Sequence, residues 1–297
     1  MASVEVARPR RIALVQAAFS LGALAAIVWW GLRQRAPHIP LDPPALGKLC
    51  AALGLYAVAT VLRAERWHRI LRRSELDRGR GESYRLTLVG YMGNNTLPAR
   101  AGDLLRVVLL RSARRATLGT VVAERLLDVA ALGLVFLVVV LDRGLSFGPL
   151  PYLAAAGAAA VVAAAGLWRF APKVREWVRP VAGATRDLVS PHGAGLFGLS
   201  LAVWVAEASV YLAVGSAVGV HLGATGALYV MALTNLSALI PAAPGYVGTF
   251  DAAVLLALRS LSLPSLGYLL VLRFILFVPI TVAGFAVFLA RYSRRRR

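Results

Sequence analysis

The chain alternates between long apolar runs and short basic segments. An α-helix rises about 1.5 Å per residue, so about 20 apolar residues cross the ~30 Å hydrocarbon core of a bilayer. Runs of that size cover 12–32, 45–62, 121–141, 151–168, 196–218 and 266–289. The first run reaches Trp29 and Trp30, which favours a retained span over a signal peptide. The pattern predicts an all-α polytopic membrane protein with about six full spans.

Two further apolar segments are too short to cross. The segment 86–97 ends at Pro98, and the segment 228–240 ends at Pro241. The first would extend only about 18 Å as a helix. We therefore expect two re-entrant hairpins built from broken helices.

The two breaks share a sequence pattern. Aligning Pro98 with Pro241 places Gly102 on Gly245, giving P-A-x-x-G in both copies. An asparagine precedes each break (Asn95 and Asn235), and an acid follows it (Asp103 and Asp251). The pattern predicts an internal repeat within a single membrane domain, 1–297, with half-repeats at about 45–141 and 196–290.

The basic residues determine the expected orientation. The net charge is +19, and most arginines lie between apolar runs, as in the cytoplasmic loops of membrane proteins. Segments 63–85 and 169–194, and both termini, are therefore expected in the cytoplasm. The first half of 63–85 is expected to extend a helix, with Trp67 at the interface, and 169–194 to contain an interfacial helix. The first hairpin then enters from the cytoplasm and the second from outside, which predicts an inverted-topology repeat.

Composition narrows the function classes. Apolar residues make up 59% of the chain, and the mean hydropathy is +0.69, which indicates an integral membrane protein. Because no soluble domain presents a groove, the positive charge does not indicate nucleic-acid binding. Cys50 is the single cysteine, and the four histidines lack ligand spacing, so neither a metal site nor a cofactor is expected.

Ionisable residues in apolar segments are the candidate functional residues. Each costs roughly 2.5–3.5 kcal/mol on insertion scales, so such residues are seldom without a role. An arginine suits a lipid phosphate because its planar fork can bind two oxygens, and backbone amides freed at the breaks also favour anions. The alternative is structural, with ion pairs that lock hairpins to spans or arginines that reach the interface. The set is Arg100, Asp103, Arg106, Glu124, Arg125, Asp128, Glu207, Asp251 and Arg273.

An enzyme is the competing class. Membrane glycosyltransferases that use polyprenyl-linked sugars carry an acid in an outer loop, where Asp42 lies. Asp42 stands beside two prolines, which is typical of a turn. The chain contains no HExxH, GxSxG or P-loop motif and no paired acids.

Four segments together resemble the flippase-like, or lysylphosphatidylglycerol synthase transmembrane-domain, family. They are NNTLPARAGDLLRVVLL, VVAERLLDVAAL, PAAPGYVGTFDAAVLLAL and YLLVLRFILFVPITVAG, in the family's order. The resemblance implies a fold like the flippase half of multiple-peptide-resistance factor proteins, which move aminoacylated phosphatidylglycerol between leaflets. Tyr246 departs from a usual glycine, and Asp103 and Asp251 from a common glutamate. No soluble synthase domain follows, so lysyl transfer is not expected of this chain.

The residues carried over from the family extend the candidate site. They are Pro98, Arg100, Gly102, Asp103 and Arg106 from the first motif, Glu124, Arg125 and Asp128 from the second, Gly245, Gly248, Phe250 and Asp251 from the third, and Arg273. With Asn95, Glu207 and Pro241 they predict a substrate site between the breaks. The expected function is transport of a phosphate-containing lipid (aminoacyl-phospholipid, glycolipid or polyprenyl type) across the inner cell membrane, without catalysis. The alternatives are a lipid or glycosyl transferase and an accessory subunit of a lipid-modifying synthase.

Overall fold

The structure is a computed structural model that describes residues 42–76, 78–97, 100–144, 179, 183, 185–238, 244–263 and 265–292. These residues are all-helical, as expected. They form eight α-helices, joined by loops and two short 3-10 helices, Asp187–Val189 and Pro244–Tyr246. The helices are α2 (Pro43–Arg73), α3 (Arg80–Thr96), α4 (Ala101–Leu109), α5 (Arg114–Arg143), α8 (Pro191–Ala217), α9 (Gly223–Ser237), α10 (Thr249–Ser260) and α11 (Leu266–Arg291).

Three described helices, α2, α8 and α11, are long and apolar enough to cross a membrane. Helix α5 has 30 residues, but charged side chains near both ends leave Val129–Leu141 as its uncharged stretch. The expected spans at 12–32 and 151–168, and most of the segment 169–194, lie outside the described residues. The protein is thus a polytopic helical membrane protein.

Local chemistry explains where the long helices begin. Pro43 is the first residue of α2, a position that needs no backbone N–H donor. The hydroxyl of Ser190 accepts a hydrogen bond from the Gly193 amide at 3.2 Å and caps α8. Ser265 caps α11 in the same way, through the Tyr268 amide at 3.1 Å.

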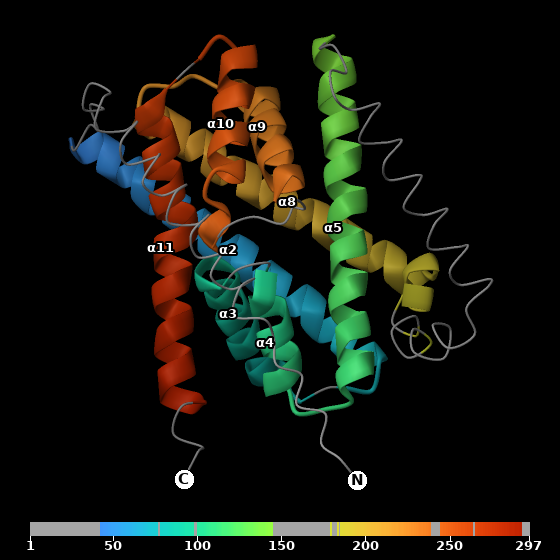
Figure 1. Cartoon of the computed structure of the whole chain (residues 1–297). Coiled ribbons are helices and arrows are strands. Elements are labelled where there is room, and N and C mark those ends of the chain that lie inside the picture. The colour runs from blue at the N-terminus through green and yellow to red at the C-terminus, as the bar shows by residue number, and fades with distance from the viewer. Residues whose placement is uncertain are drawn as a thin grey trace, which may run out of the picture.

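The described helices fall into two groups along the chain, α2–α5 and α8–α11, and the most extensive packing is between the groups (Figure 1). Helices α2 and α8 run antiparallel and share the most extensive contact, including the Lys48 Nζ bond to the Ser216 carbonyl at 2.9 Å. Helix α3 packs on α11, from the other group, and α9 packs on α5. In both cases, the first helix of a hairpin (α3 or α9) packs against the last helix of the other group (α11 or α5).

The two hairpins point toward each other. Figure 1 shows α3–α4 in the lower half and α9–α10 in the upper half, with their connections near the centre. Glycines permit the close packing around the first hairpin. A Cβ on Gly102 would lie 2.0 Å from the Gly90 carbonyl oxygen, and one on Gly284 of α11 would lie 2.5 Å from that of Leu88. Both positions exclude a larger residue unless the helices move apart.

The aligned P-A-x-x-G motifs do not occupy equivalent places. Gly102 lies in the first turn of α4, whereas Gly245 lies in the 3-10 helix of the longer connection before α10. The connection covers 97–100 in the first hairpin and 238–248 in the second. Because the loops differ in length, residues counted from the prolines fall out of register. Pro98 and Pro241 lie outside the described residues.

The segment expected to begin the cytoplasmic extension of α2 is partly buried. The helix continues to Arg73 as expected, but Arg63 and Arg66 are 4% and 0% exposed. Trp67, expected at the membrane interface, is fully buried and donates a hydrogen bond to Thr120 Oγ1 at 3.1 Å. The prediction that Trp67 lies at the membrane interface is therefore wrong, because this face of α2 packs into the protein core.

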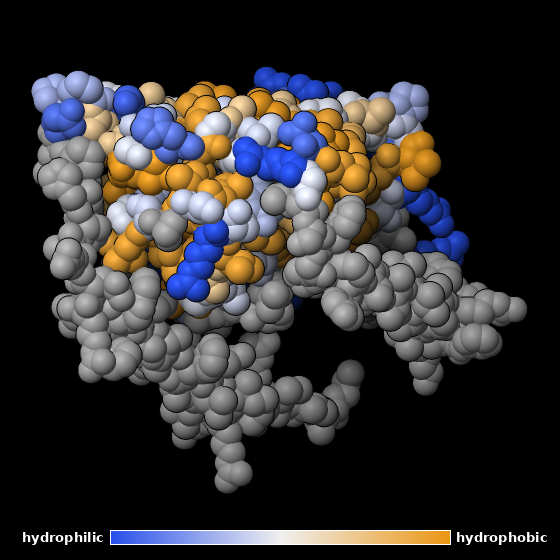
Figure 2. Space-filling model, turned by 90° about the horizontal axis from the view of Figure 1, so that it is seen from above, coloured by the Kyte–Doolittle hydropathy of each residue, from blue (hydrophilic) through white to orange (hydrophobic). Residues whose placement is uncertain are grey.

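The outer surface suits lipid. Large apolar side chains are exposed on several helices, among them Leu104, Val138, Phe274 and Val282. Apolar residues also cover much of the coloured part of the face shown in Figure 2. Several charged side chains, among them Arg66, Arg106 and Glu124, are instead buried inside the helical assembly.

Candidate functional site

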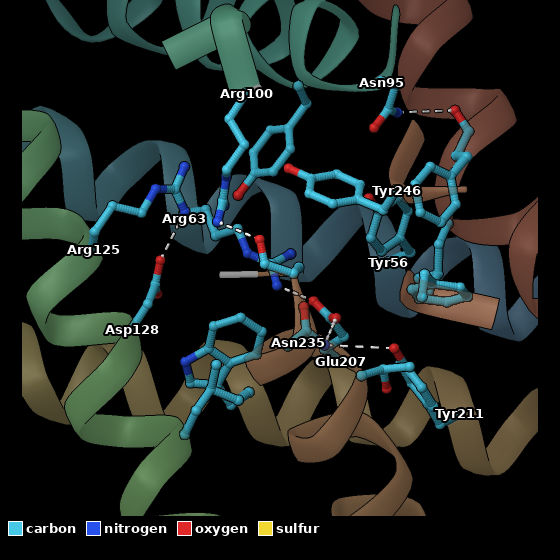
Figure 3. Close-up of a pocket in the computed structure, with 18 residues that line it drawn as sticks. Tyr56, Arg63, Asn95, Arg100, Arg125, Asp128, Glu207, Tyr211, Asn235 and Tyr246 are labelled. Atoms are coloured by element: carbon cyan, nitrogen blue, oxygen red, sulfur yellow. Dashed lines mark hydrogen bonds and ion pairs between the residues drawn. The ribbon is translucent and has the colours of Figure 1, made fainter. Parts of the chain in front are cut away.

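A cavity of about 100 Å³ lies where the hairpin connections meet α2, α5, α8 and α11 (Figure 3). Its wall combines aromatic side chains, which exclude water, with a few charged and amide groups. The charged lining residues are Arg63, Arg100, Arg125, Asp128 and Glu207. The other polar and aromatic ones include Tyr56, Tyr91, Asn95, Trp204, Tyr211, Asn235, Tyr246, Phe250 and Phe277.

Glu207, which the sequence placed mid-span, has partners in the cavity. Its carboxylate forms an ion pair with Arg63 of α2, and Asn235 Nδ2 donates to its Oε1 at 2.8 Å. The Arg63 guanidinium lies 5.0 Å from the centre of the Trp204 ring. These contacts join α2, α8 and the end of α9, and they neutralise Glu207.

Six charged side chains, four buried and two partly buried, form a closed ring at one side of the cavity. Each arginine contacts two acids and each acid contacts two arginines, so the ring carries no net charge. The contacts are Arg66–Glu124 at 3.3 Å, Glu124–Arg106 at 2.6 Å, Arg106–Asp103 at 3.3 Å, Asp103–Arg125 at 3.0 Å, Arg125–Asp128 at 3.0 Å and Asp128–Arg66 at 2.8 Å. The ring ties α4, which carries Asp103 and Arg106, to α2 and α5.

Arg100 differs from the other cavity arginines. It precedes α4 in a left-handed conformation (φ 56°) and reaches toward the second hairpin. Its Nη1 donates to the Ala238 carbonyl at 3.1 Å, and its guanidinium lies 5.6 Å from the centre of the Tyr246 ring. Arg63 and Arg125 have carboxylate partners, whereas Arg100 has none among the described residues. Arg100 Nε is also buried without a hydrogen-bond partner.

One known protein family matches most of the chain. A family model described as "Lysylphosphatidylglycerol synthase TM region" matches residues 12–284. The chain belongs to this family. No curated protein and no solved structure matches it significantly.

The family motif in the second hairpin forms its own ion pair. Arg273 of α11 donates to Asp251 Oδ1 at 2.5 Å and to the Gly245 carbonyl at 2.8 Å. Asp251 Oδ2 accepts a bond from the Gly248 amide at 2.9 Å, which caps α10. Arg273 also lies 5.0 Å from the centre of the Phe277 ring. Arg273 thus holds the hairpin connection against α11 and does not line the cavity.

The ion pairs of the two hairpins correspond. Asp103 and Asp251 are each the third residue of the second hairpin helix. Each pairs with an arginine 22 positions later, Arg125 and Arg273, on the long helix that follows. The acids downstream of the breaks are therefore equivalent, although the glycines upstream of them are not.

The remaining candidate residues lie at or near the connections. Asn95 lines the cavity and donates to Thr281 Oγ1 of α11 at 2.8 Å. Gly245 adopts φ 64°, and a Cβ there would lie 3.3 Å from the Asn95 carbonyl oxygen. The structure thus brings Asn95, Arg100, Arg125, Asp128, Glu207 and Phe250 to the cavity and places the other described candidates around it. Asp42 is exposed and precedes α2, away from the cavity lining.

Sequence reasoning missed Arg63 and Arg66. Both begin a basic segment, so their charge suggested a cytoplasmic loop. A usable signal exists in the helical spacing, because Ala52, Tyr56, Arg63, Trp67 and Ile70 recur on one buried face of α2. In the part of the chain that the structure describes, no cluster of three or more His, Cys, Asp or Glu could hold a metal ion.

Proposed function

We propose that the protein moves a phosphate-bearing lipid between the two leaflets of the inner cell membrane, without changing it chemically. The observation that carries this proposal is Arg100, a cation without a described carboxylate partner, inside a cavity between two opposed hairpins. A partly buried arginine in that state favours an anion, and its planar fork suits phosphate oxygens. Family membership supports a lipid as the source of that phosphate.

The hairpins supply a plausible two-sided gate. Helices α3 and α9 have 17 and 15 residues, so they extend about 25 Å and 22 Å, less than the ~30 Å hydrocarbon core. Each hairpin would then enter and leave on one side of the membrane, the first from the cytoplasm and the second from outside. Such an inverted repeat places a substrate site near the midplane, between the breaks. Both termini would lie in the cytoplasm.

The size of the cavity limits what enters it. A cavity of about 100 Å³ has room for several water molecules or a phosphate group, but it is too small for two acyl chains. The chains would therefore remain in the bilayer while the headgroup crosses. A phosphate on Arg100 would compete with the bond to the Ala238 carbonyl and so loosen the contact between the hairpins. A synthase that makes the transported lipid is the expected protein partner.

Transport by purified protein in proteoliposomes tests the proposal. We expect the wild-type protein to expose fluorescently labelled phosphatidylglycerol to an outer quencher faster than protein-free vesicles do. Replacing Arg100 with glutamine removes the charge-assisted bonds, so the rate should fall at least about tenfold. The matched control is R115Q, which removes one positive charge from an exposed position. Equal rates for folded R100Q and wild type would contradict the proposal.

A further inference from the structure

A second hollow lies at the end of α2, separate from the central cavity. Its volume is about 450 Å³, and none of its lining residues lines the central cavity. The lining contains four arginines, one acid and one histidine: Glu65, Arg69, Arg72, Arg73, Arg80 and His192. The arginines come from the end of α2 and the first residue of α3, and His192 comes from the first turn of α8.

The acids around this hollow do not balance its arginines. Glu65 is already engaged on both oxygens, by Arg69 Nε at 3.0 Å and Arg80 Nε at 3.1 Å. Tyr84 also donates to Glu65 Oε2 at 2.9 Å. Arg73 pairs with Asp187 at 3.2 Å, while Arg72 has no ion-pair partner among the described residues. Four guanidinium groups therefore share two carboxylates.

The arginine side chains remain accessible to a ligand. Those of Arg69, Arg73 and Arg80 are 50%, 62% and 63% exposed. Exposed ion pairs contribute little stability, about 0–1 kcal/mol, so a stronger acceptor can replace or share them. The excess of donors over acceptors is what an anion-binding site requires.

His192 supplies an independent indication of a ligand. Its Nε2 atom is buried and has no hydrogen-bond partner in the described structure. A buried polar atom left unpaired costs free energy, and a rotation of the ring that turns Nε2 toward a ligand in the hollow would recover it. In the tautomer with a proton on Nε2, this atom donates a hydrogen bond, as the arginines do.

We propose that this hollow binds a phosphate group, with Arg72, Arg80 and His192 as its principal donors. Phosphate fits better than a single carboxylate because it has three acceptor oxygens and carries a charge of about −1.5 to −2 as a monoester near neutral pH. That charge matches the excess of two positive charges, since Arg69, Arg72, Arg73 and Arg80 have only Glu65 and Asp187 as acids among the described residues. The phosphate belongs either to a lipid headgroup or to a soluble phosphate, and both present the same oxygens.

Binding there would connect three helices from both groups. Arg72 is on α2, Arg80 on α3 and His192 on α8. Among the described residues, Arg73–Asp187 is the one ion pair that joins the C-terminal end of α2 to the segment just before α8. The site is separate from the central cavity, since the two sets of lining residues do not overlap.

The test measures phosphate binding to the full chain in phosphatidylcholine nanodiscs by isothermal titration. Inorganic phosphate is the probe in one arm and short-chain phosphatidic acid in the other. All variants are made in an R100Q background, which removes the proposed phosphate ligand of the central cavity. We expect R72Q with R80Q to weaken binding at least about tenfold, since two charge-assisted bonds are lost.

Two further variants distinguish a built site from general positive charge. H192F keeps the number of charged groups but removes a donor, and we expect it to weaken binding by about tenfold. R115Q removes a charge from an exposed position outside the hollow and should change the affinity less than twofold.

Each outcome decides the proposal. Much tighter binding of phosphatidic acid than of phosphate, lost in the Arg72 and Arg80 variant, assigns the site to a lipid headgroup. Equal affinities, lost in the same variant, assign it to soluble phosphate. No binding of either probe overturns the site, as does binding that H192F leaves unchanged or that R115Q weakens as much as the paired substitution. A transport failure of R100Q alone bears on the central cavity and not on this site.

Discussion

At the scale of single residues, the buried ring is the most demanding feature of the molecule. Three of its members, Arg66, Arg106 and Glu124, are almost completely withdrawn from solvent, with side chains at 0%, 2% and 1% exposure, whereas Asp103 and Arg125 are 14% and 22% exposed. Burying charges costs several kcal/mol per ion, which is recovered only while every partner is present. Loss of one member therefore leaves two opposite charges without full compensation.

Glu124→Gln should destabilise the protein strongly. Glu124 pairs with both Arg66 and Arg106, and each of these arginines has one other acid in the ring. The substitution therefore removes one of the two ring ion pairs of each arginine. We expect the free energy of unfolding, measured by SDS titration of the purified protein, to fall by about 3–5 kcal/mol. Asp187→Asn breaks the exposed pair with Arg73 and should cost less than about 1 kcal/mol. Equal losses for the two variants would show that the ring is not a unit of stability.

Arg273→Lys should not preserve function, although it preserves charge. The guanidinium binds the Asp251 carboxylate and the Gly245 carbonyl together, and an ammonium group on a flexible stem cannot reproduce that fork. We expect transport in the proteoliposome assay to fall at least about tenfold. Arg259→Lys, at an exposed position on α10, serves as the control and should retain the wild-type rate. Full activity of R273K would mean that charge alone suffices at this position.

Sequence reasoning found most of the charged residues around the site but could not pair them. Asp103, Arg106, Glu124, Arg125 and Asp128 stood out because ionisable groups are costly in apolar segments. Their partners depend on how α2, α4 and α5 pack, which spacing along one helix does not determine. Arg66 was missed for the same reason, since only the packing of α2 shows that it faces inward.

At the scale of elements, the two hairpins are held unequally. The ring secures the first hairpin through Asp103 and Arg106, both on α4. The second hairpin is joined to α11 through the Asp251–Arg273 pair, whose side chains are 12% and 24% exposed. The second hairpin is therefore the more easily displaced of the two.

Hydrogen exchange should reveal this difference. Local opening requires less free energy where fewer buried contacts are lost. We expect amides at the start of α10, near Gly248 and Asp251, to exchange faster than those at the start of α4, near Asp103. Mass spectrometry of the protein in nanodiscs measures both segments in one experiment. Slower exchange at α10 than at α4 would show that the second hairpin is not the more easily displaced of the two.

The short helices were predictable from the short apolar runs that end at Pro98 and Pro241, whereas their alignment was not. Matching the motifs from Pro98 and Pro241 ignored that the second connection, 238–248, is longer than the first, 97–100. Counting instead between acid and arginine gives the same 22-residue separation in both halves. The separation between the paired acid and arginine is thus the same in both halves, whereas the length of the connecting loop is not.

At the scale of the whole molecule, hydropathy alone predicted a polytopic helical protein, which the structure and the family match confirm. The exchange of contacts between halves, α3 on α11 and α9 on α5, lies beyond the sequence because it depends on packing between distant segments. This exchange couples the hairpins, since a shift of either one changes its contact with the long helix of the other half.

The central claim is that lipid headgroups pass between the two hairpin connections. The most direct measurement is transport by a protein whose connections are joined by a short reversible cross-linker. The cysteines replace Thr96, at the end of α3, and Tyr246, in the 3-10 helix that contacts α3, with the exposed Cys50 changed to serine. The account predicts that cross-linking stops phosphatidylglycerol movement and that cleavage of the linker restores it to the rate of the untreated double variant. Unchanged transport in the fully cross-linked protein would show that lipid does not take this path.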